Sequence, residues 1–246
     1  MAIISIRTFQ KEFDSYFAKE DLQGAEACAL RWLDIARKHN DYAGEAMIYD
    51  EMAGFYRRTG EKEKAFDAVF RCFALLDDFH ADWRARGIIY LNGATTMKAF
   101  GEAEKAMEYY DKSESYLEGN MEKDDPVWAG FYNNKALALQ DLKRYSESEK
   151  CFLTAIEITE TSTKNVLETA ISLVNLAHLY YEMNSEDERV NPLMEKALDI
   201  LECPDYFGYV KYAFTCRKCA PSFGFFGYFL AEKTLNERAD KIYAGN

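Results

Sequence analysis

The chain has 246 residues, of which 48% are hydrophobic and 15% aromatic, with only 13 glycines and 4 prolines. This balance favours a helix-rich globular fold over disorder, and the net charge of −12 disfavours binding to nucleic acid or anionic lipid. No apolar run approaches the roughly 18 residues of a membrane span, and the first residues lack a signal-peptide pattern. Six cysteines without framework-like spacing indicate reduced thiols, so we expect a cytoplasmic protein.

A pattern of two amphipathic helices recurs along the chain at a step near 41 residues. A large residue lies four places before the residue at which the two helices cross. The large residues are Phe9, Tyr49, Tyr90, Tyr132 and Leu173, and the crossing residues are Phe13, Ala53, Ala94, Ala136 and Ala177. The second helices repeat Ala25, Ala65, Ala106, Ser148 and, after a one-residue slip, Val190. Self-similarity at a fixed period is typical of a solenoid, because one helix pair cannot bury its apolar face alone.

Breaking residues support this division into helices. We expect first helices at 6–18, 42–59, 82–99, 126–142 and 165–183, and second helices at 22–39, 62–79, 102–118, 145–161 and within 186–202. Gly60 and Gly101 lie at turns, and Asp125 before Pro126 is an N-cap followed by proline at the first helical position. Asn191–Pro192 indicates a late start or a kink in the fifth second helix. The last segment is expected to form helices at 205–219 and 222–243, with Pro221 opening the second.

This spacing resembles the tetratricopeptide repeat (TPR), whose two antiparallel helices cross at small residues. The usual TPR period is about 34 residues, so the units here are more similar to the long repeats of kinesin light chains and Rap-type peptide-pheromone receptors. The resemblance covers about residues 6–202. It implies an all-α, right-handed superhelix (α-α solenoid) of about six helix pairs, forming one domain over 1–246. The expected repeats are 6–40, 41–81, 82–122, 125–162 and 164–203, followed by an atypical capping pair at 205–246.

In TPR arrays the first helices line the concave groove, where ligands usually lie. The position two residues before the crossing residue holds Asn92, Asn134 and Asn175 in three successive repeats. An amide offers one acceptor and two donors, which match the backbone of an extended peptide. Further candidates in the groove are Thr95, Asn133, Leu137 and His178. The alternative is that these asparagines only link adjacent helices.

The C-terminal segment is rich in aromatic residues, with ten between Tyr206 and Phe229. One interpretation is that this helix pair packs on the fifth repeat, with Gly224 and Gly227 allowing close approach. The other is an exposed aromatic patch that mediates homodimerisation or binds a ligand. Cys216 and Cys219 form a C-x-x-C motif without further zinc ligands or a thioredoxin-like context, so we interpret them as structural.

These observations predict a non-catalytic scaffold that binds another protein or an extended peptide and needs no cofactor or metal. Acidic residues such as Asp50 and Glu51 in the expected groove disfavour the chaperone-tail class of TPR, which holds a terminal carboxylate. An alternative is a regulatory receptor for a small signalling peptide, similar to the Rap-type proteins, although no effector bundle precedes the first repeat. A third is a small-molecule role for the C-terminal aromatic cluster.

Overall fold

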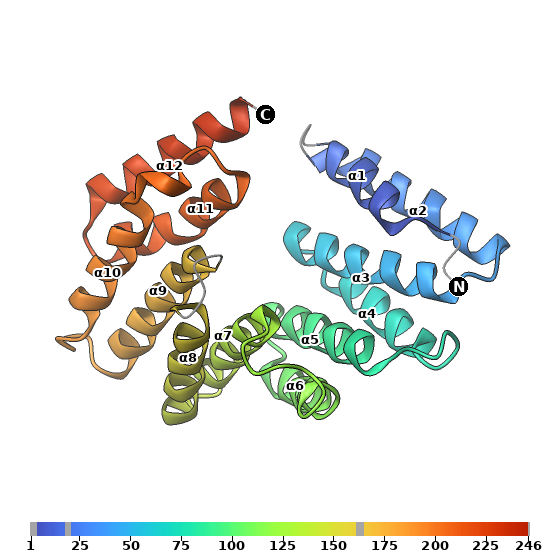
Figure 1. Cartoon of the computed structure of the whole chain (residues 1–246), viewed down its shortest axis with the longest axis horizontal. Coiled ribbons are helices and arrows are strands. Elements are labelled where there is room, and N and C mark those ends of the chain that lie inside the picture. The colour runs from blue at the N-terminus through green and yellow to red at the C-terminus, as the bar shows by residue number, and fades with distance from the viewer. Residues whose placement is uncertain (1–3, 18–20, 161–164, 246) are drawn as a thin grey trace. The chain divides into compact units, whose positions relative to one another are not determined.

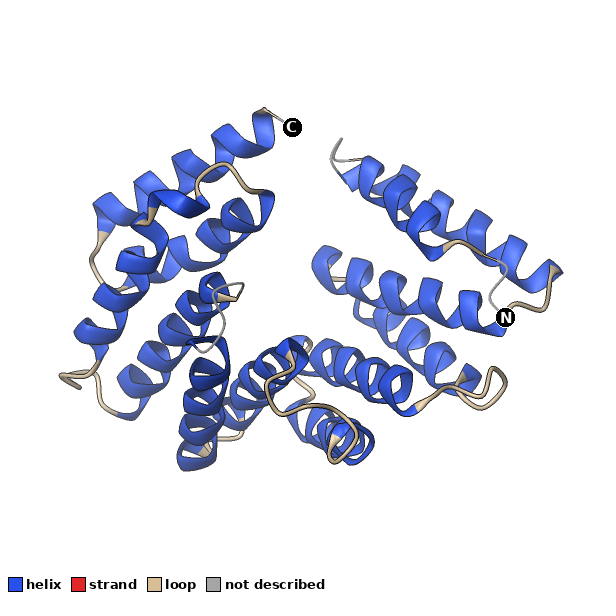
Figure 2. Ribbon diagram, in the orientation of Figure 1, coloured by secondary structure: helices blue, strands red, loops and turns tan. Residues whose placement is uncertain are grey.

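A computed structural model describes residues 4–17, 21–160 and 165–245, and this part of the chain is helical without strands (Figure 2). The first helices of six pairs are α1 (Ile6–Phe17), α3 (Tyr42–Thr59), α5 (Trp83–Ala99), α7 (Pro126–Asp141), α9 (Val166–Met183) and α11 (Val210–Phe225). Their second helices are α2 (Leu22–Lys38), α4 (Lys62–Leu75), α6 (Ala103–Leu117), α8 (Tyr145–Glu160), α10 (Val190–Glu202) and α12 (Phe229–Ala244). The predicted all-α fold of about six helix pairs is confirmed. The helix ends expected at residues 18 and 161 lie outside the described residues.

Internal contacts divide the chain into two compact units. The first comprises residues 1–122 with α1 to α6, and the second comprises residues 123–246 with α7 to α12 (Figure 1). Each unit therefore contains three helix pairs with their own core. The prediction of one domain with a right-handed course over 1–246 stays a prediction.

Small residues allow the two helices of a pair to cross closely, as the repeat pattern predicts. Ala94, Ala136 and Ala177 on the first helices are fully buried, and so are Ala65, Ala106 and Ser148 on the second helices. The Ser148 hydroxyl donates to the carbonyl of Ala136 at 2.8 Å, so these backbones approach within the reach of one short side chain. Larger side chains there would push α7 and α8 apart and open the core around them.

The helix ends follow from local chemistry. Asp125 accepts a hydrogen bond from the Val127 backbone N–H at 3.0 Å and is followed by Pro126, which confirms the predicted N-cap and proline start of α7. Gly60 and Gly101 end their helices at φ of 78° and 80°, a left-handed conformation that glycine adopts without a steric penalty. Lys143 adopts φ of 58° at the equivalent turn after α7, where the chain carries a side chain instead.

The fifth second helix starts late, which decides between the two predicted alternatives. Helix α10 begins at Val190, so Asn191 and Pro192 lie in its first turn, where a backbone N–H has no intrahelical acceptor. No kink is needed. Val190 is the first residue of α10, whereas Ser148 is the fourth residue of α8, so the slip noted in the repeat pattern marks a real change of register.

The boundary predicted in the C-terminal pair is wrong. Pro221 lies inside α11, which runs on to Phe225, and the turn follows at residues 226–228 with Gly227 at φ of 86°. A proline inside a helix costs about 3 kcal/mol, but α11 buries Tyr212, Cys216 and Phe223 completely, and this burial outweighs the cost. A Cβ at Gly224 would lie 2.3 Å from the Glu232 carboxylate of α12, a flexible side-chain end that can move, so close approach of Gly224 to the fifth repeat stays a prediction, whereas Gly227 serves the turn.

Candidate functional site

In the first unit, the predicted Asn92 links two adjacent first helices. Its side-chain amide on α5 donates to the Asp50 carboxylate on α3 at 2.7 Å, and both side chains are half-buried. Burial raises the pKa of Asp50 to about 7, with the neighbouring Glu51 charge adding to the rise and the Asn92 hydrogen bond and Arg57 opposing it. Burial also lowers the pKa of the Arg57 guanidinium. This face of the unit therefore combines an amide with ionisable groups held in a poorly solvated setting.

Thr95 lies one turn further along α5 and is also half-buried. Its hydroxyl donates to the Leu91 carbonyl of its own helix at 2.9 Å and lies 3.5 Å from the hydroxyl of buried Tyr110. Thr95 therefore connects the first-helix face to the second helix α6.

In the second unit, a hydrogen-bonded cluster joins α7 and α9. The Asn133 carbonyl oxygen accepts from the Asn175 amide at 3.0 Å and from the Ser172 hydroxyl at 3.2 Å. Asn133 is buried, so it serves as an internal link, as the alternative interpretation of the asparagines holds. Asn134, Asn175 and Leu137 remain half-buried, and Leu137 packs against the core of this unit.

His178 is the point at which polar and aromatic groups meet. Its Nε2 lies 2.9 Å from the Ser222 hydroxyl of α11, and its ring lies 5.2 Å and 4.8 Å from the rings of Phe225 and Phe226, centroid to centroid. Burial lowers the pKa of His178, which favours the neutral imidazole near pH 7. Tyr181, one turn further along α9, contacts Phe225 edge to face at 5.2 Å.

Part of this cluster was missed from the sequence. Ser222 and Phe225 reach His178 only because α11 continues past Pro221, and the sequence predicts a helix start at that point. Phe225 is 57% exposed and Tyr181 38% exposed, so they present apolar surface next to His178, which lies one turn after Asn175 on α9. We call the five residues Asn134, Asn175, His178, Tyr181 and Phe225 the first-helix face of the second unit.

Among the residues that the structure describes, we find no reactive C-x-x-C pair and no arrangement of metal ligands. Cys216 and Cys219 are buried on α11, and burial raises the pKa of both thiols, that of Cys219 to about 12, which leaves them protonated and unreactive. No group of three or more His, Cys, Asp or Glu side chains in the described ranges is arranged to hold a metal ion. None of the described helices has the length and apolarity to cross a membrane.

Comparison with known proteins gives both a sequence match and a fold match. The tetratricopeptide repeat model matches residues 129–202. BtubC (BKLC) from P. vanneervenii has a similar structure, with a TM-score of 0.63, 20% identity and coverage of 91% of each chain. The putative kinesin light chain repeats of Podosopora anserina align with a TM-score of 0.55 at 16% identity, over 80% of this chain and 94% of that one.

A third similar structure is a signal transduction ATPase with numerous domains (STAND) from Pyrococcus horikoshii, which carries a tetratricopeptide repeat sensor. It aligns with a TM-score of 0.64 and 16% identity, over 96% of this chain and 36% of that protein. At these identities the likeness concerns the fold alone. No curated protein matches the sequence.

Proposed function

We propose that the chain is a non-catalytic scaffold that binds another protein, or an extended peptide, on its first helices, because residues 129–202 match the tetratricopeptide repeat model and the fold is similar to that of TPR-like repeats. The observation that carries the proposal is the first-helix face of the second unit. It carries half-buried amides on two successive repeats, α7 and α9, and exposed aromatic side chains that pack around His178 of α9 and on each other.

The amides and the aromatic residues supply different parts of the binding free energy. Asn134 and Asn175 can hydrogen-bond to the backbone of an extended peptide, each contributing about 0.5–1.5 kcal/mol net. Phe225 and Tyr181 can cover an apolar side chain of the peptide, and the aromatic contact area adds to the affinity. His178 is held by Ser222 and presents a second polar group between them.

The net charge of the protein restricts the charge of the partners that it can bind. The net charge of −12 favours a neutral or basic partner, because an acidic segment would be repelled over the whole surface. In the first unit, Asp50 and Glu51 lie on α3 next to Asn92, which favours a basic residue of the partner there. A cytoplasmic protein or a small signalling peptide fits these requirements.

The experiment is selection of binding peptides from a displayed random library, followed by titration of the selected peptide. We expect Asn175→Ala and Phe225→Ala each to weaken binding about fivefold to thirtyfold, which corresponds to about 1–2 kcal/mol. Leu153→Ala is the matched control, because Leu153 is an exposed side chain on the second helix α8. Selected peptides that bind all three variants as tightly as the parent protein would place the site elsewhere.

Self-association is a second candidate that a separate observation favours. Of the C-terminal aromatic residues, Tyr212 and Phe223 are buried and Phe226 and Tyr228 pack against the core, whereas Phe229 is 71% exposed. Leu230 beside it is 79% exposed. Two adjacent apolar side chains at the start of α12 would be covered by a second copy of the chain in a homodimer.

A further inference from the structure

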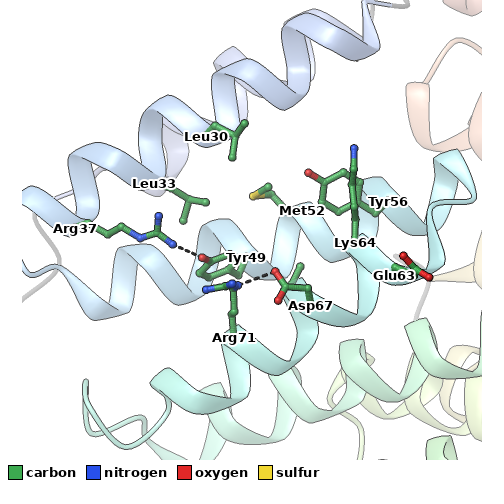
Figure 3. A pocket seen from close by; sticks show the side chains of 11 residues that line it. Leu30, Leu33, Arg37, Tyr49, Met52, Tyr56, Glu63, Lys64, Asp67 and Arg71 are labelled. Carbon is green, nitrogen blue, oxygen red and sulfur yellow. Dashed lines mark hydrogen bonds and ion pairs between the residues drawn. The ribbon is translucent and has the colours of Figure 1, made fainter.

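A cavity of about 420 Å³ opens on the surface of the first unit, over α3 and between α2 and α4 (Figure 3). Its lining comes from α2, α3 and α4 and includes none of Asp50, Asn92 and Thr95. Its floor and one wall are apolar, formed by Leu30 and Leu33 of α2, Met52 of α3 and Ala68 of α4. Leu33, Met52 and Ala68 are buried, whereas Leu30 is 52% exposed at the rim.

The cavity exists because of side-chain size, as the next repeat demonstrates. In register with the repeat, Tyr49 corresponds to Tyr90 and Ala68 corresponds to Tyr109. Over Tyr90, the ring of Phe73 lies at 4.8 Å and the ring of Tyr109 at 6.1 Å, centroid to centroid, so aromatic rings occupy the space between α4 and α6. Over Tyr49, the methyl group of Ala68 leaves the corresponding space open.

A second pair of differences between the two repeats explains why the cavity is centred on Ala68. Phe73 corresponds to Leu33, and it packs so closely on Gly93 that a Cβ there would lie 2.4 Å from its ring. Met52 stands at the position of Gly93 and recovers part of the bulk that Leu33 lacks. Ala68 is left as the position at which a whole ring is missing.

Two guanidinium groups mark one end of the cavity. Arg37 of α2 and Arg71 of α4 approach Tyr49 from different helices, each with its Cζ 5.8 Å from the centre of the ring (Figure 3). Arg37 also donates through Nη2 to the Tyr49 hydroxyl. The side chains of both arginines are about half exposed, so solvent and solutes reach them.

Carboxylates orient these arginines without covering them. The Nε of Arg37 donates to Glu45 at 2.8 Å, and the Nε of Arg71 donates to Asp67 at 2.6 Å. Each carboxylate contact uses Nε, and Arg37 also uses Nη2 for the Tyr49 hydroxyl, so each guanidinium group, with its five N–H donors, keeps further N–H groups that can donate to a ligand. A planar fork of this kind suits a carboxylate or phosphate oxygen pair.

We propose that this cavity binds an organic anion that carries an apolar chain or ring. Its anionic group lies at Arg37 and Arg71, and its apolar part lies on Leu33, Met52 and Ala68. The volume falls within the range of small-molecule sites. Besides its apolar and tyrosine side chains, the lining carries three cations and two carboxylates: Arg37, Lys64, Arg71, Glu63 and Asp67. Only charge complementarity at the arginine end selects an anion over a neutral molecule of the same shape.

The test is a titration of the isotope-labelled protein with octanoate, followed by NMR of the backbone amides. We expect saturable shifts that centre on Leu33, Met52 and Ala68, with a dissociation constant on the order of millimolar for a ligand of this size. Octanol, which lacks the charge, and acetate, which lacks the chain, are the matched probes. Both are expected to bind more weakly than octanoate.

Two variants test the apolar and the ionic contributions to octanoate binding separately. Ala68→Tyr inserts the ring that Tyr109 supplies in the next repeat and should weaken octanoate binding by at least about tenfold, since it fills the cavity. Arg71→Gln removes one exposed charge and should weaken it about threefold to tenfold. Ala99→Tyr, on an exposed position of α5, is the control for adding a ring and should leave binding unchanged.

Several results would overturn the proposal. If octanol binds as tightly as octanoate and Arg71→Gln has no effect, the anionic group does not contribute to binding. If octanoate shifts the amide signals of the C-terminal aromatic residues most, or shifts the same signals in a folded Ala68→Tyr variant, then octanoate does not bind in this cavity. If Ala68→Tyr does not fold, Arg71→Gln decides alone, because its side chain is half exposed and its loss leaves the core intact.

Discussion

The partly buried carboxylate of Asp50 should make the free energy of unfolding depend on pH. Its carboxylate accepts from Asn92 between α3 and α5, and burial raises its pKa from an ordinary 3.8 to about 7. An unfolded chain exposes the same carboxylate to water, where it titrates near its ordinary value. Between these two pKa values the folded protein therefore holds a proton that the unfolded chain has released.

The sign of the pH dependence follows from this difference. Stability from the protonated Asp50 is fully present below pH 3.8, falls as the pH rises through the window between 3.8 and about 7, and levels off above it. A difference of about 3 pKa units corresponds to at most about 4 kcal/mol. Because the side chain is only half-buried, retained water reduces the effect, and we expect about 1–3 kcal/mol.

The measurement is urea unfolding of the parent protein and of Asp50→Asn at pH 5 and pH 8. Asparagine keeps an acceptor for Asn92 and cannot ionise, so the parent should lose about 1–3 kcal/mol relative to the variant between the two pH values. Asp199→Asn, at an exposed position of α10, is the control and should follow the parent. The reasoning would be refuted if the free energy of unfolding changed by the same amount between pH 5 and pH 8 in the parent and in Asp50→Asn.

Three further predictions concern the turns, the C-terminal patch and the thiols. Gly60→Ala should cost about 1 kcal/mol because of its left-handed φ, whereas Gly54→Ala, in the open interior of α3, should stabilise by about 0.5–1 kcal/mol; urea unfolding compares them. If Phe229 mediates a homodimer, light scattering should show a dimer at high concentration that Phe229→Glu converts to monomer, and a parent that stays monomeric contradicts it. Cys216 and Cys219 should react with a thiol reagent only in denaturant, and rapid labelling of the native protein would show that their burial is incomplete.

Most helix boundaries could be predicted, because the signals for them are local. Alanines at the crossings, glycines at the turns and Asp125–Pro126 act within one or two turns of chain, and α3 and α7 begin at the predicted residues. Pro221 is where this approach failed. Its local preference is to open a helix, but burial of Tyr212 and Phe223, which the proline itself does not reveal, carries α11 through it.

The positions of the groove candidates followed from the repeat register, whereas their role in binding stays a prediction. Asn92 on α5 and Asn175 on α9 are half-buried, and each hydrogen-bonds to the preceding first helix, α3 and α7 respectively. Their hydrogen-bond partners, Asp50 and Asn133, could not be identified from the sequence, because they lie about one repeat away and several polar residues compete for each amide. The contact of His178 with Ser222 likewise depends on the corrected course of α11.

The amino-acid sequence by itself determined the period, the helix pairs and the small residues at which they cross, because a repeat stacks only if each copy keeps the same buried positions. Only the tertiary structure decided which side chains of neighbouring repeats meet. The cavity over Tyr49 illustrates this difference: Ala68 and Tyr109 occupy the same register, and both suit a helix. Whether the space above the tyrosine is open or filled depends on three helices at once, and no single stretch of sequence carries that information.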